Sequence, residues 1–311
     1  MTIYTRRGFI QTAVAGATGA TLLTFMGSQA ALARSPAFTV TELGGNVKLI
    51  AGGDANVVAY GAPEGLLLLD GGSKAQSAAI LKEALKATGT KKLHTLFNSH
   101  WHPEQTGLNE QAGKSGATIV AHENTKLWLK RRINTEWLPE KGFGPLPASA
   151  IPGKSFYTRE EMPFGSEALT YGHLGQAHTD GDLYVHFRNA NVLFAGGVVA
   201  APDAWPLLDW QTGGWIGGLV GAQDRLIKAC NDSTKIVGSN GAAIDLKALK
   251  AQREMFMTVF DRTVKALVKG LGPEEAYGTG PAKEFEAQMG DSKAFVIASF
   301  KSLWGHYAPD A

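Results

Sequence analysis

The stretch Asn98-Ser99-His100-Trp101-His102-Pro103-Glu104-Gln105-Thr106-Gly107 is the most informative part of this chain. It directly follows the apolar run Leu93-His94-Thr95-Leu96-Phe97, which predicts a buried strand. Side chains two residues apart leave an extended chain on the same side. If extended geometry continues past the strand end, the imidazoles of His100 and His102 converge on one ion.

A third histidine completes this pattern. His178 lies in Gly175-Gln176-Ala177-His178-Thr179-Asp180-Gly181-Asp182, in a predicted loop between two strand-like segments. Three neutral imidazoles around one ion leave a coordination position open. Such an arrangement suits a catalytic zinc ion, which lowers the pKa of a bound water to near neutrality.

Two later segments extend the pattern, Leu193-Phe194-Ala195-Gly196-Gly197 and Val237-Gly238-Ser239-Asn240-Gly241. With them, the chain resembles the metallo-β-lactamase superfamily. That family has His-x-His-x-Asp-His, a His before Thr-x-Gly-Asp, an Asp after a strand ending in Phe-x-Gly, and a late His in Gly-His-Gly. The resemblance implies that His100, His102 and His178 are the ligands of the family's first metal site.

The resemblance continues outside these motifs. Residues 56–72 are similar to the family's opening hairpin and Asp-Gly turn, and residues 117–124 to the strand and helix start that follow its main motif. The similarity covers most of residues 34–311. It implies an α/β fold, a four-layer αββα sandwich in which two mixed β-sheets are flanked by helices.

The family's second metal site is largely dismantled here. Glu104 stands in place of an Asp, Gln105 in place of a His, Gly197 in place of the metal-bridging Asp, and Asn240 in place of the last His. Amide oxygens suit hard cations and are poor zinc ligands, and glycine offers no ligand. We therefore expect one metal ion, zinc, with iron as the second candidate because some family members bind iron.

Five further residues receive expected roles. Glu104 is a fourth ligand or a general base acting on the metal-bound water. Asn240 or Gln105 donates a hydrogen bond to the developing oxyanion. The resemblance implies that Asp70 supports the ligands from behind, and we expect Asp182 to do the same for the loop that carries His178.

Two hypotheses about function follow. In the first, the protein is a metal-dependent hydrolase in which one metal-activated water attacks a small-molecule lactam, lactone, thioester or other ester. In the second, it is a non-catalytic exported protein of the same fold, whose degenerate metal site binds a small molecule or a partner protein. An iron oxygenase ranks third, because it needs more carboxylate ligands. The formal net charge of +2 gives no indication of nucleic acid binding, and the sequence makes no prediction of oligomeric state.

The N-terminal segment predicts export. Thr5-Arg6-Arg7-Gly8-Phe9-Ile10 resembles a twin-arginine signal, and Ala31-Leu32-Ala33 offers a cleavage site. We expect a signal peptide over residues 1–33, cleavage after Ala33, a mature domain over residues 34–311, and a periplasmic or otherwise exported protein. The apolar stretch of the signal is short and broken by Gly and Thr, so no integral membrane segment is expected in the mature chain.

Four other features bear on the site. Residues 130–155 predict a long loop, which either borders the substrate cleft or is a plain surface excursion. Trp101 should point away from the metal by strand alternation. Among the remaining histidines, His173 is the candidate whose loop could bring it near the metal. The aromatic segment 204–215 is either a wall of the cleft or core packing.

Overall fold

Seven strands form the first sheet, in which an antiparallel half leads into a parallel half. In spatial order they are β1 (Thr39–Gly44), β2 (Val47–Ala51), β3 (Val57–Ala62), β4 (Gly65–Leu69), β5 (Leu93–Asn98), β6 (Thr118–His122) and β7 (Lys154–Phe156). Strands β1 to β4 pair antiparallel, and β4 to β7 pair parallel. The predicted strand over residues 93–98 is β5.

Five strands form the second sheet, in the order β12 (Lys235–Val237), β11 (Val192–Phe194), β10 (Leu183–Phe187), β9 (Glu167–His173) and β8 (Arg159–Phe164). Only β11 and β12 pair parallel; the other neighbours are antiparallel. Both sheets are therefore mixed.

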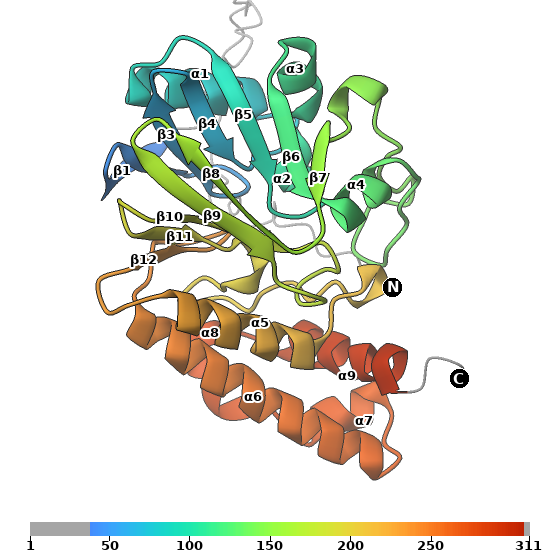
Figure 1. Cartoon of the computed structure of the whole chain (residues 1–311). Helices are drawn as coiled ribbons and strands as arrows, with labels where there is room; N and C mark the ends of the chain where they lie inside the picture. Colours follow the sequence, from blue (N-terminus) through green and yellow to red (C-terminus); the bar gives the residue numbers. More distant parts are fainter. Residues whose placement is uncertain (1–37, 308–311) are drawn as a thin grey trace, which may run out of the picture. The chain divides into compact units, whose positions relative to one another are not determined.

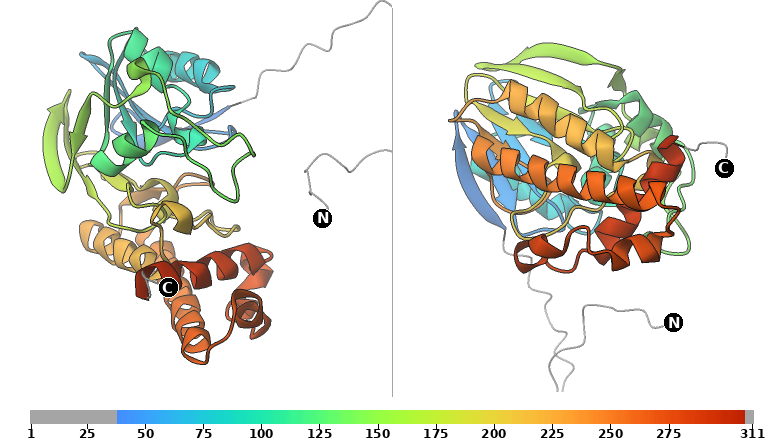
Figure 2. Two further views of the ribbon diagram at one scale, coloured as in Figure 1. Left: turned by 90° about the vertical axis from the view of Figure 1, so that its right-hand side faces the viewer. Right: turned by 90° about the horizontal axis from the view of Figure 1, so that it is seen from below.

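Helices cover the outer faces of the two sheets (Figure 1). Helices α1 (Ser77–Thr88) and α3 (Asn109–Lys114) pack on the first sheet, and α5 (Ile216–Ala229), α6 (Leu246–Val268) and α9 (Lys293–Tyr307) pack on the second. In the view from below in Figure 2, the orange and red helices lie across the second sheet. The smaller helices are α2 (Pro103–Thr106), α4 (Glu123–Leu129), α7 (Pro273–Gly278) and α8 (Glu286–Met289). This arrangement confirms the predicted four-layer αββα sandwich.

Strand alternation explains why the central strands are continuously apolar. In β4, Leu67 and Leu69 face the core between the sheets, whereas Leu66 and Leu68 face the core beneath α1. All four are fully buried. Burial of a leucine side chain contributes about 1.5–3 kcal/mol, so both faces of the strand stabilise the sandwich.

The computed structural model describes residues 38–307. The predicted signal peptide, residues 1–33, lies outside them. Within the described range, no helix has both the length and the apolarity that crossing a bilayer requires.

Several chain segments that follow strands meet at one edge of the sandwich. The motif follows β5, the segment around Gly197 follows β11, and Asn240 follows β12. A hydrogen bond of 3.0 Å from Leu183 N to Ser99 O links the two sheets at this edge. Loops gathered at one edge are the usual place for a functional site in this class of fold.

Candidate metal centre

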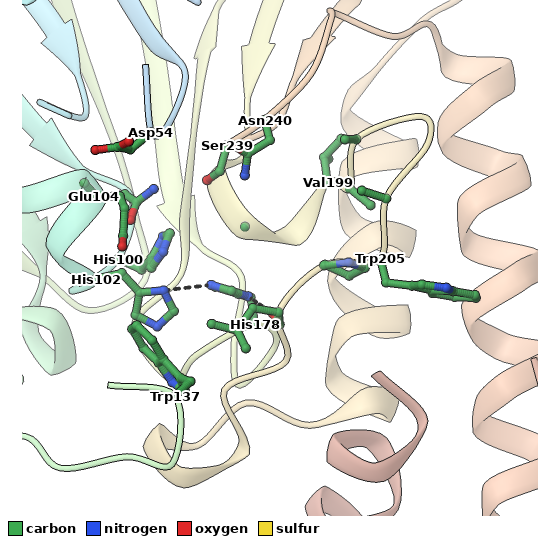
Figure 3. Close-up of a pocket in the computed structure, with 17 residues that line it drawn as sticks. Asp54, His100, His102, Glu104, Trp137, His178, Val199, Trp205, Ser239 and Asn240 are labelled. Carbon is green, nitrogen blue, oxygen red and sulfur yellow. Dashed lines mark hydrogen bonds between the residues drawn. The ribbon is translucent and has the colours of Figure 1, made fainter. Parts of the chain in front are cut away.

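Three histidines from two separate loops meet in a buried cluster (Figure 3). His100 and His102 follow β5, and His178 lies between β9 and β10. Each contributes one ring nitrogen to a set in which all nitrogens lie within 4.8 Å of one another. No other group of three or more His, Cys, Asp or Glu side chains of this kind occurs in residues 38–307.

A continuous segment, residues 207–214, holds two of these rings from outside; we call it the strap. The Leu207 carbonyl oxygen accepts a hydrogen bond from His178 Nδ1. Asp209 Oδ2 accepts a hydrogen bond of 3.0 Å from His102 Nε2. Asp209 N also donates to the His178 carbonyl oxygen at 3.0 Å. The strap therefore fixes the orientation of both rings.

These outward bonds determine which nitrogens remain free. A carbonyl oxygen only accepts, so His178 Nδ1 carries the proton and Nε2 has a lone pair. By the same argument, His102 Nε2 donates to the Asp209 carboxylate and Nδ1 has a lone pair. The two free nitrogens lie 3.3 Å apart, joined by a dashed line in Figure 3. Neither carries a proton in these tautomers, so the two lone pairs face each other, an arrangement that a bound cation would stabilise.

The spacing of the two nitrogens fits zinc. Tetrahedral zinc with Zn–N bonds of about 2.0–2.1 Å places neighbouring nitrogen ligands about 3.3 Å apart. The observed distance from His102 Nδ1 to His178 Nε2 is 3.3 Å. Two of the three histidines therefore have the spacing of neighbouring zinc ligands, and the third ring nitrogen lies within 4.8 Å of both.

Burial keeps the three imidazoles neutral. It lowers the pKa of His100 and of His102 well below 6.5, and each pKa falls further because the neighbouring imidazoles would repel a second positive charge. Burial also lowers the pKa of His178, although the carboxylate of Asp209 opposes that change. Neutral imidazole is the form that binds a metal ion.

Asp70 acts on His100 through Ser99 and does not touch the ring. The Asp70 carboxylate accepts hydrogen bonds of 2.7 Å from both Ser99 N and Ser99 Oγ. Because the Ser99 hydroxyl donates its hydrogen bond to Asp70, its oxygen accepts one from His100 Nδ1 at 2.9 Å. The proton of the His100 ring is therefore on Nδ1, and Nε2 is unprotonated. Burial raises the pKa of Asp70 to about 8, and the two bonds from Ser99 pull it down. A cation on the histidines would lower it further.

Asp182 has a matching position behind the third histidine. Its carboxylate accepts hydrogen bonds from Thr179 N at 2.7 Å and from Thr179 Oγ1 at 3.1 Å. Thr179 directly follows His178, so these bonds fix the turn that presents the imidazole. Burial raises the pKa of Asp182 well above its ordinary value.

The other three predicted site residues line the same cavity, which has a volume of about 340 Å³. Glu104 lies in the first turn of α2, and burial and then the charge of Asp54 raise its pKa. Gln105 is buried, and its Oε1 has no hydrogen-bond partner within the described range. Asn240 is exposed at the rim, and its side-chain nitrogen faces the cavity in Figure 3.

Sequence comparison places the chain in a family. The sequence model of the metallo-beta-lactamase superfamily matches residues 50–234, more than half of the chain. The chain belongs to this superfamily. The matched range includes the three histidines of the cluster, as well as Asp70 and Asp182. Among curated proteins, no sequence match was found.

Solved metallo-β-lactamases share the fold at low sequence identity. One from Pontibacter korlensis is 18% identical with a TM-score of 0.60, over 71% of this chain and 99% of that one. The metallo-β-lactamase DIM-1 is 15% identical with a TM-score of 0.58, over 72% and 98%. One from Hirschia baltica is 18% identical with a TM-score of 0.57, over 70% and 97%. These similarities show the fold of the superfamily.

Gly197 lies directly against the imidazole ring of His178. A Cβ atom at Gly197 would lie 2.3 Å from Cδ2 of the His178 ring, which is far too close for a real contact. The bond from His178 Nδ1 to Leu207 prevents the ring from moving aside. A side chain at position 197 would therefore collide with the imidazole of His178.

His173 lies outside the histidine cluster, contrary to the expectation that its loop could approach the metal. Its ring stacks on His122, with centroids 3.6 Å apart and planes at 9°. His173 Nε2 donates to the Asp180 carbonyl oxygen at 3.0 Å, and His122 Nε2 donates to the Tyr157 carbonyl oxygen at 3.2 Å. Stacking and hydrogen bonds to main-chain oxygens therefore hold both of these imidazoles away from the cluster.

Aromatic residues surround His102. Trp101 is fully buried and points into an aromatic cluster, as strand alternation predicts, and its ring stacks on Trp137 with centroids 5.7 Å apart. Trp137 comes from the long loop over residues 130–155, lies 4.6 Å from the His102 ring, and lines the cavity. Trp205 also lines the cavity. The loop therefore borders the site.

Three residues of this site were not predicted from the sequence: Ser99, Trp137 and Asp209. Asp209 lies in the aromatic segment 204–215, between Trp205 and Trp210. Its burial could have been inferred from those neighbours, and a buried Asp usually has a specific partner.

Proposed function

We propose that this protein is a hydrolase that uses one zinc ion, held by His100, His102 and His178, to cleave an ester, thioester, lactone or lactam. The observation that carries the proposal is the pair of unprotonated nitrogens 3.3 Å apart, each fixed by a hydrogen bond on the far side of its ring. Bound zinc supplies Lewis-acid activation of water and of the substrate carbonyl.

The side chains of the cavity supply the remaining functions. Glu104 accepts a proton from the attacking water and returns it to the leaving group. Asn240, whose nitrogen faces the cavity, donates a hydrogen bond to the carbonyl oxygen as negative charge develops on it. Gln105 is the second candidate for this donor. Trp137 excludes water from one side of His102.

The shape and lining of the cavity favour a small molecule. Its volume of about 340 Å³ falls in the range of small-ligand sites. Apolar side chains form much of the cavity wall, among them Trp137, Val199, Pro206 and Leu207. We therefore propose that the acyl part of the substrate lies against this wall. On the basis of residues 5–10, we also propose that the protein acts after export.

Metal analysis of the full chain tests the proposal. We expect one zinc per chain in the wild type, and almost none in His102→Ala. His94→Ala is the matched control, because His94 lies on β5 outside the cluster, and it should keep its zinc. Iron in place of zinc would correct the identity of the metal. A wild type that stays metal-free after supplementation would favour the non-catalytic binding protein.

Activity measurements complete the test. A panel of chromogenic lactam, lactone, thioester and ester substrates should include one that the zinc-loaded wild type cleaves. Cleavage should disappear with a chelator, return with zinc, and be absent in His102→Ala. Zinc binding without any cleavage across the panel would contradict the hydrolase proposal.

A further inference from the structure

The charged side chains that line the cavity are all acidic. They are Asp54 and Glu104; among the described residues of the lining there is no Lys or Arg. Neither carboxylate forms an ion pair with Lys or Arg within residues 38–307. Figure 3 shows both carboxylates on the same side of the cavity. The protein therefore leaves this side of the cavity negatively charged.

Two buried oxygen atoms in the same cavity have no donor within the described part of the chain. Ser239 Oγ and Gln105 Oε1 both lack hydrogen-bond partners, although the side chains are only 6% and 4% exposed. Figure 3 shows Ser239 on the same side of the cavity as Asp54 and Glu104. A buried acceptor without a donor costs free energy, so a ligand with several N–H donors would relieve it.

The opposite side of the cavity is apolar. Val199 and Trp205 lie across the cavity from Asp54 in Figure 3, and Leu207 completes this wall. We therefore expect a substrate with a cationic donor at the end that faces Asp54 and Glu104, and an apolar chain at the end that faces Val199 and Leu207. A substrate carboxylate that pointed toward Asp54 and Glu104 would meet no cationic side chain, which disfavours an anionic group at this position.

We propose that the substrate carries a primary ammonium group, which binds between Asp54, Glu104 and Ser239. This inference rests on the proposed function and names the substrate class of the same site. Asp54 is its specificity-determining residue. It is held in place by hydrogen bonds of 2.5 Å from Ser73 Oγ and 3.3 Å from Gln76 Nε2, so its carboxylate is positioned before a ligand arrives.

Three p-nitrophenyl esters with the same five-methylene chain test the proposal on the zinc-loaded full chain. They end in an ammonium group (6-aminohexanoate), a methyl group (heptanoate) and a carboxylate (the pimelate monoester). We expect kcat/KM to be about tenfold higher for the ammonium ester than for the methyl ester, and lowest for the carboxylate ester. Equal rates, or a preference for the carboxylate ester, would overturn the inference and leave the hydrolase proposal standing.

Asp54→Asn is the decisive variant. It should reduce the ratio of kcat/KM between the ammonium and methyl esters by about fivefold to tenfold. Asp232→Asn makes the same charge change at an exposed site outside the cavity and should leave the ratio unchanged. Ser239→Ala keeps the charge and should reduce the ratio less than Asp54→Asn does. An unchanged ratio in Asp54→Asn would contradict the proposal.

A binding measurement separates this inference from the hydrolase proposal. Hexylammonium chloride and 1-hexanol are titrated calorimetrically into the zinc-loaded chain at neutral pH, where the amine is protonated and does not coordinate zinc. We expect hexylammonium to bind more tightly, and Asp54→Asn to remove the difference. If no ester is cleaved, the hydrolase proposal fails and this result still decides the inference. Equal binding of hexylammonium and 1-hexanol would overturn the inference. A stoichiometric calcium or magnesium ion that is present in the wild type and lost in Asp54→Asn would also overturn it, because the carboxylate would then hold a metal ion.

Discussion

Asp209 and His102 are separated by 107 residues in the chain, yet a hydrogen bond of 3.0 Å joins Asp209 Oδ2 to His102 Nε2. The same carboxylate oxygen accepts a hydrogen bond of 2.6 Å from Thr212 Oγ1, which in turn accepts one of 3.0 Å from Trp101 Nε1. Both residues are buried. This relationship sets the tautomer of His102 and therefore which nitrogen faces the other imidazoles.

Asp209→Ala should weaken zinc binding by about 10- to 100-fold, because the His102 ring loses the acceptor that orients it. Competition with a chromogenic chelator measures the affinity. Asp209→Asn keeps one acceptor oxygen and should recover part of the loss. Asp203→Ala, at an exposed position, is the control. An affinity for zinc that is the same in Asp209→Ala and wild type would show that the strap does not orient this ligand.

Gly197→Ala should impair zinc binding because its methyl group would displace the His178 ring. We expect a loss of affinity of about tenfold or more. Gly221→Ala is the matched control, since a Cβ at Gly221 meets nothing within 4 Å. That control lies in α5 and should raise stability by about 0.5–1 kcal/mol. Full zinc affinity in Gly197→Ala would show that the ring can be accommodated elsewhere.

Ser99→Ala should uncouple Asp70 from His100 and leave a buried carboxylate with one donor fewer. The free energy of unfolding should fall by about 1–3 kcal/mol, and zinc affinity should fall with it. Urea denaturation and chelator competition measure the two effects. Ser115→Ala, which removes a partly buried hydroxyl at the end of α3, serves as the control. A loss of stability without a loss of zinc affinity would limit Asp70 to a structural role.

The zinc-free protein should lose stability as the pH falls below about 6.5, the unperturbed pKa of histidine. Burial lowers the pKa of His100 and His102 in the folded chain, so below this pH the unfolded chain binds more protons. Each such histidine contributes a slope of about 1.4 kcal/mol per pH unit between its unfolded and folded pKa values. Urea denaturation with a chelator, between pH 7.5 and 5, measures the slope. His100→Asn should reduce it by the share of one histidine, and an unchanged slope would contradict the neutral state of this ring.

We propose that export depends on the arginine pair of the predicted signal. Replacing both Arg6 and Arg7 by Lys should retain the full-length precursor inside the cell, because the twin-arginine route reads this pair. Cell fractionation followed by mass spectrometry checks both the location and cleavage after Ala33. A processed, exported protein in the double variant would indicate another route.

The spacing of residues 98–107 was enough to predict the strand, the loop after it and the convergence of His100 and His102. Alternating and continuous apolar patterns predicted the central strands, because a few consecutive side chains determine which faces of a strand are buried. The resemblance to the superfamily predicted the four layers of the αββα sandwich. The edge strands β1 and β8 were not predicted, because their largely exposed, polar side chains carry little signal.

Other details depended on contacts that no local pattern contains. Apolar residues at helical spacing predict a helix over residues 73–88, whereas α1 begins at Ser77 because residues 73–76 form a turn whose side chains bind Asp54. The sequence also predicts a short helix over residues 107–114, whereas α3 begins at Asn109, after the separate short helix α2. The strap contains no strand or long helix that a sequence pattern could predict. Its contact with His178 uses the main-chain oxygen of Leu207, which any residue would provide.

The packing of His178 against Gly197 also bears on how such a protein can change over generations. An acidic residue introduced at position 197 would displace the His178 ring. It would therefore disrupt the metal centre that we propose before it could supply a ligand to a second ion. The close contact makes a second metal ion inaccessible by a single substitution at this position.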